Sequence, residues 1–198
     1  GQAGDSYALS FARVFFTSNT LTTTSTGTTY NYTFGGMVIV NGNLVTLQYA
    51  GGSYEKNLAA VQYSTPVSWR VAGNGSVPAF NTTCSEAFPT FSGFNSFPAS
   101  ISKNTGVTFT ITGFGNTERV LVALSDGNGT YVYQHEASYY NGTATVNFPP
   151  SETANFANGS NGYIDIYMYN DEVKSVNGFG MKYSNVRKEL ISGFNITN

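Results

Sequence analysis

The sequence predicts an all-β protein, and three observations support that expectation. The 198-residue chain is rich in threonine, tyrosine and phenylalanine, which favour strands over helices. Several segments alternate apolar and polar side chains with a period of two, as strands do. Turn motifs separate these segments at spacings of roughly 8–12 residues, which is typical of β-sandwiches. We therefore expect less than about one tenth helix.

Changes in composition divide the chain into three expected parts. Residues 1–72 are predicted to form a smaller packed β unit, and residues 99–198 an immunoglobulin-like β-sandwich. Between them, the stretch 66–98 holds the only tryptophan, the only cysteine, five phenylalanines and four of the six prolines. It shows no regular period after Val71, so we interpret residues 73–98 as an ordered connecting segment with buried rings.

The N-terminal part contains a strong hairpin signal. Asn41-Gly42-Asn43 stands between two β-rich runs, and Asn-Gly in that setting is typical of a tight β-turn. The serines and threonines of residues 18–29 predict a solvated loop at a hairpin tip. Trp69 shares a strand face with Val67 and Val71, so we expect it to be buried. The predicted strands of this part are 7–17, 30–40, 44–50, 54–63 and 67–72.

The C-terminal part alternates more strictly. Residues 106–112 place three apolar side chains on one strand face and three threonines on the other. The turn Asp126-Gly127-Asn128-Gly129 is predicted to pair Ser125 with Thr130 in a hairpin. Ser151 is predicted to cap a short helix over residues 151–157. The other predicted strands of this part are 119–125, 130–137, 143–148, 162–169, 173–183 and 189–197.

Charge and hydropathy exclude several classes of partner. Charged residues make up 10% of the chain, against about 25% in typical soluble proteins. The net charge is -2 and the nine lysines and arginines are scattered, so we expect no nucleic acid partner. No apolar run approaches the roughly 20 residues of a membrane-spanning helix. No signal peptide is present, and we expect that the sequence starts after a processed segment.

A single cysteine and a single histidine limit the available chemistry. They form neither an internal disulfide nor a zinc site, so we expect no metal and no cofactor. Cys84 is expected to be a small buried apolar residue. A serine triad is not expected, because no G-x-S-x-G motif occurs and Glu136 points away from the adjacent His135 in a strand. We expect no enzyme and no catalytic residues, while a Cys84–His135 pair and a carboxylate pair stay open.

Two acidic segments resemble cation sites only in part. The residues from Asp126 to Thr130 start like a calcium loop, but Tyr131 occupies the position that requires glycine. A plain hairpin turn is therefore favoured there. For Asn170-Asp171-Glu172, between two predicted strands, we also favour a solvated turn over a weak cation site.

One strand carries the candidate binding residues. Alternation over residues 162–170 commits three aliphatic side chains to the core and turns four polar or aromatic ones outward. Aromatic rings stack on the apolar side of a sugar ring, and a carboxylate accepts its hydroxyl hydrogens. The alternative is that these tyrosines only cover the sheet surface. The candidate ligand-binding residues are Tyr163, Asp165, Tyr167 and Tyr169, opposite Ile164, Ile166 and Met168.

Several short strings resemble a known class of proteins. They are S-W-R-V-A-G-N-G-S-V-P-A-F, F-P-T-F, S-F-P-A-S-I-S-K and V-L-V-A-L-S-D-G-N-G, all from residue 66 onward. The sequence there resembles uncharacterised surface lipoproteins of the Bacteroidetes, over about two thirds of the chain. The resemblance implies export, and attachment to the cell envelope through a lipidated cysteine upstream of Gly1. It implies no activity and no functional residues.

These observations leave two classes of function. The first is a non-catalytic protein of the cell envelope or outer membrane surface, or a secreted one, that binds a glycan or a surface protein. The second is a structural subunit for assembly, such as a pilin-like or spacer protein. A hydrolase is a distant third.

Overall fold

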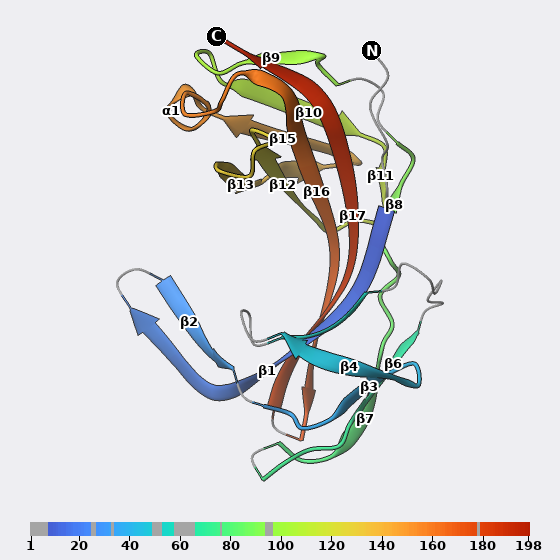
Figure 1. The fold of residues 1–198 in the computed structure, drawn as a ribbon. Helices are drawn as coiled ribbons and strands as arrows, with labels where there is room; N and C mark the ends of the chain where they lie inside the picture. Colours follow the sequence, from blue (N-terminus) through green and yellow to red (C-terminus); the bar gives the residue numbers. More distant parts are fainter. Residues whose placement is uncertain are drawn as a thin grey trace. The chain divides into compact units, whose positions relative to one another are not determined.

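The computed structural model describes residues 8–24, 27–32, 34–48, 53–57, 66–75, 77–93, 97–177 and 179–198. Within these residues the protein is nearly all β and has one helix of four residues (Figure 1). The prediction of an all-β chain with little helix is confirmed. None of the helical structure described is long and apolar enough to cross a membrane.

The chain divides into two compact units, each formed from segments that are distant in sequence. The first unit consists of Gly1–Leu9, Pro89–Tyr169 and Arg187–Asn198. The second consists of Ser10–Phe88 and Asn170–Val186, so it includes a segment of the C-terminal part. The sequence analysis divided the chain into folding domains at 1–72, 73–98 and 99–198, and that division stays a prediction.

Two sheets build the first unit. One has the strand order β13–β12–β16–β17, with β9 added parallel to β17, and the other has the order β10–β15–β14. A short pair, β8 with β11, stands beside them. The strands are β8 (Thr90–Phe91), β9 (Ser100–Ser102), β10 (Val107–Thr112), β11 (Phe114–Gly115), β12 (Arg119–Ser125), β13 (Val132–Glu136), β14 (Ser138–Tyr140), β15 (Thr143–Phe148), β16 (Gly159–Val176) and β17 (Phe179–Thr197).

Alternation along the strands decides which side chains enter the core of this unit. The aliphatic residues predicted from β16 are fully buried, and the threonines of β10 face outward as expected. Both sheets contribute to one apolar cluster, so they pack face to face. Its fully buried members from β12, β15 and β16 are Val120, Val122, Leu124, Ala144, Phe148, Ile164, Ile166 and Met168.

The second unit is one sheet with the order β16–β17–β1–β5–β4–β3–β6–β7, and β2 pairs with β1. The Asn41-Gly42 hairpin is confirmed: both residues have positive φ, 43° and 80°, and Val40 pairs with Asn43. Trp69 is 2% exposed and lies with Val67 and Val71 in the core, as predicted. The strands are β1 (Ala8–Thr24), β2 (Gly27–Tyr32), β3 (Val38–Val40), β4 (Asn43–Gln48), β5 (Ser53–Asn57), β6 (Val67–Val71) and β7 (Phe80–Cys84).

Side chains of β16 and β17 hold the segment that follows β7. The Asn170 amide donates to the carbonyl oxygen of Ala87 at 2.7 Å, and the backbone N–H of Ser85 donates to the Glu172 carboxylate at 2.7 Å. The Asn185 amide donates to the carbonyl oxygen of Glu86 at 2.5 Å. Polar side chains of β16 and β17 therefore bond to the backbone of the segment after β7, where strand pairing ends.

Two predicted irregular segments contain strands. Residues 18–29 were expected to be a loop, but β1 and β2 pair through most of them, with Thr22 opposite Thr29. Threonine is β-branched and fits a paired strand, so polarity alone was a poor guide there. The predicted lack of regular structure after Val71 is also wrong, because β7 and β8 lie in that stretch.

Three further predictions need correction. Asn170-Asp171-Glu172 is not a turn, and the predicted strand 173–183 is not a separate strand, because β16 runs on to Val176. Lys182 pairs with Asp171 and Lys174 pairs with Glu172, so these carboxylates are neutralised within paired strands. Ser125 pairs with Val132 instead of Thr130, a shift of two residues that leaves the predicted faces unchanged.

The short helix α1 spans Pro150–Thr153, and Ser151 is not its cap. Pro149 occupies the N-cap position, and a proline begins the helix. The predicted strand 54–63 begins as expected with β5, while its residues 58–63 lie outside the described part of the chain.

We expect Trp69→Ala to lower the free energy of unfolding by about 3–5 kcal/mol, because it removes a large buried ring from the core of the second unit. Denaturant unfolding measures the change. Ser68→Ala, at the exposed neighbour on the opposite strand face, should change stability by less than about 0.5 kcal/mol. Equal midpoints for the two variants would contradict the burial of Trp69.

Two glycines of one turn provide a second test. Gly127 and Gly129 both have positive φ, 80° and 71°, so alanine is strained at either position by about 1–2 kcal/mol. A Cβ on Gly127 would lie 1.7 Å from the carbonyl oxygen of Asn161, whereas a Cβ on Gly129 meets nothing within 4 Å. We therefore expect Gly127→Ala to lower the thermal unfolding midpoint clearly more than Gly129→Ala. Similar midpoints would show that this turn packs differently.

Candidate functional site

The predicted binding residues of β16 share one strand face. Cross-strand pairing places Tyr169 opposite Arg119 of β12, and Asp165 opposite Ala123. The three tyrosines are half-buried, not fully outward, and Asp165 is 9% exposed. The strand thus brings the four residues together as predicted, but on a partly covered surface.

Asp165 is the centre of a small polar network. Its Oδ2 lies 2.9 Å from the Lys188 ammonium and accepts a long hydrogen bond of 3.5 Å from the Tyr167 hydroxyl. Burial, followed by the negative charge of Asp165, raises the pKa of Tyr167. Burial would lower the pKa of Lys188, but its interactions with Asp165 and Tyr167 outweigh that effect and raise it. Oδ1 of Asp165 is buried and has no hydrogen-bond partner among the described residues.

Cations lie over two of the tyrosine rings. The Arg119 guanidinium is 4.1 Å from the centroid of the Tyr169 ring, and the Lys188 ammonium is 5.2 Å from that of Tyr167. These cation–π contacts occupy ring surface that a sugar would need for stacking. We call the surface formed by Tyr163, Asp165, Tyr167 and Tyr169 the β16 face. It has the predicted residue types, but cations of the protein already cover part of the surface of two of its rings.

A second aromatic surface lies on the β14–β15 hairpin. The Tyr140 ring is 84% exposed, while the adjacent Tyr139 points inward and its ring meets Phe114 edge-on at 5.8 Å. Asn141-Gly142 forms the turn, with φ of 46° and 77°. A hollow of about 430 Å³ adjoins Tyr140, lined by Ser138, Tyr139, Tyr140, Asn141, Thr143 and Thr145.

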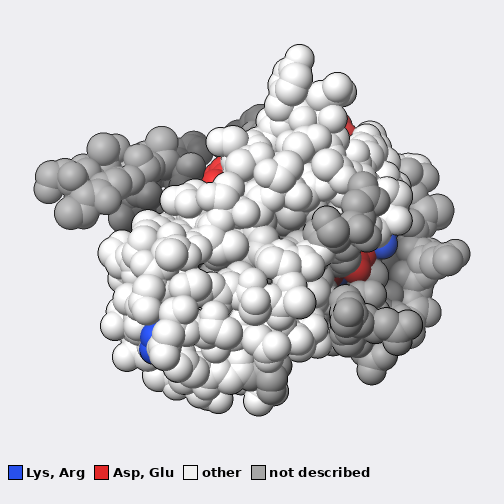
Figure 2. All heavy atoms as spheres, turned by 90° about the horizontal axis from the view of Figure 1, so that it is seen from above, with Lys and Arg blue, Asp and Glu red and all other residues white. Residues whose placement is uncertain are grey.

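The sheet surface beside Tyr140 is uncharged. Tyr140 pairs with Thr143, which pairs with Thr112 of β10, and the next row joins Ser138, Thr145 and Thr110. All of these side chains point away from the core, and each carries a hydroxyl group. We call this outward surface of β10, β15 and β14 the Tyr140 face. Charge is scarce elsewhere too: in the view of the molecule from above, the described atoms are almost all uncharged (Figure 2).

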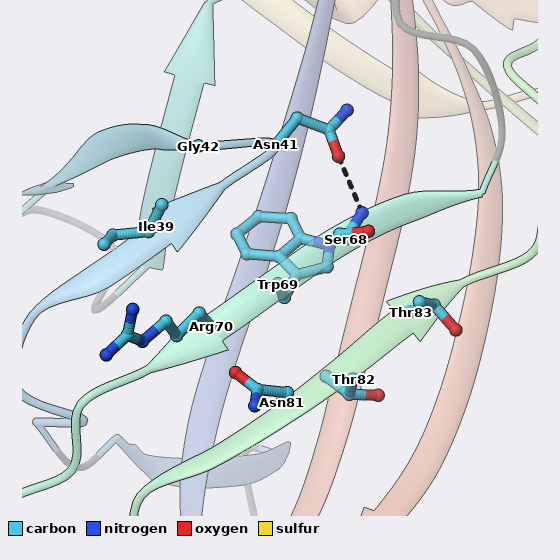
Figure 3. A pocket seen from close by; sticks show the side chains of 9 residues that line it. All are labelled: Ile39, Asn41, Gly42, Ser68, Trp69, Arg70, Asn81, Thr82 and Thr83. Carbon is cyan, nitrogen blue, oxygen red and sulfur yellow. Dashed lines mark hydrogen bonds between the residues drawn. The ribbon is translucent and has the colours of Figure 1, made fainter.

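A third surface lies in the second unit, on the outer side of β3, β6 and β7. It is an open hollow of about 730 Å³ (Figure 3). Register places Arg70 between Ile39 and Asn81, and Ser68 beside Thr83. The hollow is lined by Ile39, Asn41, Gly42, Ser68, Trp69, Arg70, Asn81, Thr82 and Thr83, and Arg70 is its one charged member. We call it the Arg70 hollow.

The side chains with reactive chemistry either have a partner or are buried. Nε2 of His135 lies 2.8 Å from the Glu152 carboxylate, and its ring packs on Phe148. Cys84 is fully buried, as predicted, and burial raises the pKa of its thiol to about 12. Asp126 accepts the Asn128 backbone N–H at 3.0 Å, which is an Asx turn. Among the described residues, no group of histidine, cysteine and carboxylate side chains is arranged to hold a metal ion.

The sequence analysis missed both Tyr140 and Arg70. Asn141-Gly142, directly after Tyr140, is the same hairpin signal as Asn41-Gly42, and it would have placed Tyr140 at the exposed end of a strand. Arg70 alternates with buried Trp69, so its outward direction followed from the strand pattern. Nothing in the sequence indicated which outward residues would border a hollow, because that depends on strands distant in the chain.

Comparisons of the chain with protein-family models, with curated proteins and with solved structures found no match.

Cys84 should be almost unreactive in the folded protein. Since the pKa of its thiol is raised to about 12, very little thiolate exists at pH 8. We expect an aromatic disulfide reagent to modify Cys84 at least about a hundredfold more slowly in the native protein than in denaturant. The same shift lowers the stability of the fold as the pH rises from the ordinary thiol pKa of 9.0 towards about 12, because only the unfolded state then loses the proton. Rapid native-state labelling would contradict this assignment.

Proposed function

We propose that this protein is a non-catalytic β-protein that binds a neutral glycan through the Tyr140 face. The observation that carries the proposal is the exposure of the Tyr140 ring, 84%, beside rows of hydroxyl-bearing side chains. Tyrosine combines a large apolar ring with a polar hydroxyl, and for that reason it is enriched at binding interfaces.

The chemistry of the Tyr140 face suits a sugar. A flat aromatic ring stacks on the C–H side of a pyranose, while threonine and serine hydroxyls both donate to and accept from sugar hydroxyls. The paired strands hold these groups at fixed spacings, which lowers the entropy lost on binding. Since none of the lining side chains is charged, a neutral saccharide needs no compensating charge there.

A non-catalytic role agrees with the state of the reactive groups. The imidazole of His135 is engaged by Glu152, and the Cys84 thiol is buried with a pKa of about 12. The buried thiol is therefore not presented to a ligand as a nucleophile. A hydrolase therefore stays the least supported of the three function classes.

We also propose that the first unit has the immunoglobulin-like fold. Its strand order supports this proposal: β10–β15–β14 corresponds to strands B, E and D, and β13–β12–β16–β17 corresponds to C′, C, F and G. Domains of this kind commonly act as binding modules on cell surfaces. Together with the resemblance to envelope lipoproteins, the strand order favours display on a cell envelope or secretion.

A structural or assembly subunit remains the second candidate. The length of β1, β16 and β17, 17 to 19 residues, favours it, because strands usually have about 5–6 residues. A defined oligomer or fibre in sedimentation experiments, without any glycan binding, would favour this function over the first.

The Tyr140 face can be tested by substitution. We expect the protein to bind one or more members of a panel of neutral oligosaccharides of glucose, galactose, mannose and xylose. Tyr140→Ala should lower the affinity at least about tenfold, because it removes the stacking ring. Tyr140→Phe keeps the ring and should retain most of the binding. Calorimetric titration measures the affinities, and the stability of both variants should stay within about 0.5 kcal/mol of the parent.

The β16 face provides the competing site for the same experiment. The variant with Tyr167→Ala and Asp165→Asn removes a ring and the charge that Lys188 neutralises. Asparagine is preferred to alanine because Asp165 is buried, and an amide still offers an acceptor to Lys188. If this variant loses binding while Tyr140→Ala keeps it, the glycan site is Tyr163, Asp165, Tyr167 and Tyr169. If no panel member binds the parent protein, the proposed function is wrong.

A further inference from the structure

We propose that the Arg70 hollow of the second unit binds an acidic saccharide, a sugar whose carboxylate or sulfate pairs with the Arg70 guanidinium. This site is separate from the Tyr140 face and has a different ligand class. Its binding can be lost or kept independently of the neutral glycan, so the two proposals fail separately.

The first step is the state of Arg70. Its side chain is exposed in the middle of β6, with Ile39 and Asn81 as its cross-strand neighbours. Of the lysine and arginine side chains that the structure describes, only Arg70 and Lys103 have neither an ion pair nor a ring contact. Arg70 is the one charged lining residue of its hollow.

The second step is the chemistry around Arg70. The guanidinium offers paired N–H groups that match a carboxylate or sulfate in two-point geometry. Asn41, Ser68, Asn81 and Thr83 surround it with amides and hydroxyls, which pair with sugar hydroxyls. These groups can bond several sugar hydroxyls at once, and the experiment below compares the sugar with an acidic peptide.

The third step is the rigidity of the hollow. Oδ1 of Asn41 accepts the backbone N–H of Ser68 at 2.8 Å, and the backbone N–H of Asn41 donates to the Ser68 carbonyl oxygen at 2.9 Å (Figure 3). These two bonds fasten the β3–β4 turn to β6. On the other side, the Lys174 ammonium donates to the carbonyl oxygen of Thr83. The walls are therefore fixed before a ligand arrives, which reduces the entropy lost on binding.

The fourth step is size and charge. A hollow of about 730 Å³ lies in the range of ligand pockets, about 300–1,000 Å³. The ammonium of Lys174 adds positive charge at the Thr83 end, although Glu172 pairs with it at 2.7 Å. With no carboxylate among the lining residues, the hollow favours an anionic group over a neutral one.

The sole tryptophan provides a local signal. Trp69 borders the hollow and is 2% exposed, and its indole N–H has no hydrogen-bond acceptor among the described residues. Its ring faces the core, on the opposite side of β6 from Arg70. A charged group held by Arg70 would change the electric field at this ring, so a change in its emission would support binding in the hollow. Binding at the Tyr140 face involves no tryptophan.

The experiment titrates the full chain with four probes of matched length: oligogalacturonate, a sulfated galactose oligomer, the neutral galactose oligomer and oligoglutamate. We expect at least one of the two acidic sugars to bind by calorimetry and to change the emission of Trp69. The neutral oligomer should leave the emission unchanged. The acidic sugar that binds identifies carboxylate or sulfate as the preferred anion. Added salt should weaken its binding, because the pair with Arg70 is exposed to solvent.

Arg70 variants decide the assignment. Arg70→Gln should lower the affinity for the acidic sugar at least about tenfold, and Arg70→Lys should fall between it and the parent, because lysine keeps the charge but loses the two-point geometry. Lys103→Gln removes the other cation that has no ion pair among the described residues, and it should bind like the parent. Unchanged affinity of Arg70→Gln, or no binding of either acidic sugar, would overturn the proposal. Equal or tighter binding of oligoglutamate would replace the sugar with an acidic peptide.

Discussion

The inside–outside alternation of β16 is the constraint on which both units depend. Its first half buries Ile164, Ile166 and Met168 completely, so every second residue must face away from that core. Its second half belongs to the other unit, where Asn170 and Glu172 bond to the backbone after β7. An insertion of one residue in this strand would exchange its two faces, moving aliphatic side chains out of one core and disrupting the polar bonds of the other unit.

This protein has few charged residues because uncharged polar side chains cover its outer sheet faces. Threonine, serine and asparagine cover the outer sheet faces, and they bond to each other or to backbone groups, as Thr108 does with Asn147. Hydroxyl and amide groups donate and accept at once, so a sheet covered with them can adapt to many polar ligands. Such a surface discriminates poorly by charge. Specificity must therefore come from a few larger groups, and the exposed ring of Tyr140 and the guanidinium of Arg70 are of that kind.

Local patterns predicted much of the fold. The Asn41-Gly42 hairpin, the buried face of β10 and the core residues of β16 all followed from residue periods and turn chemistry. Composition was a poorer guide, because the threonine-rich residues 18–29 pair as strands despite their polarity. The acidic run Asn170-Asp171-Glu172 resembled a turn, but Lys182 of the next strand, the nearby Lys174 and the distant backbone of Ser85 and Ala87 bond to it inside a strand. Such partners cannot be assigned without the strand order.

At the candidate site, too, the sequence pattern placed residues on a face but could not identify their spatial partners. Alternation correctly placed Tyr163, Asp165, Tyr167 and Tyr169 on one face, but it could not show that Arg119 and Lys188 would lie over two of the rings. In a chain with so few charges, most cations neutralise a carboxylate or cover a ring, and each such contact removes that group from ligand binding. Among the described residues, Arg70 keeps its guanidinium free of ion pairs and ring contacts and lines a hollow, and Tyr140 keeps most of its ring exposed. Identifying these two residues required the spatial neighbours of each, which the sequence pattern does not contain.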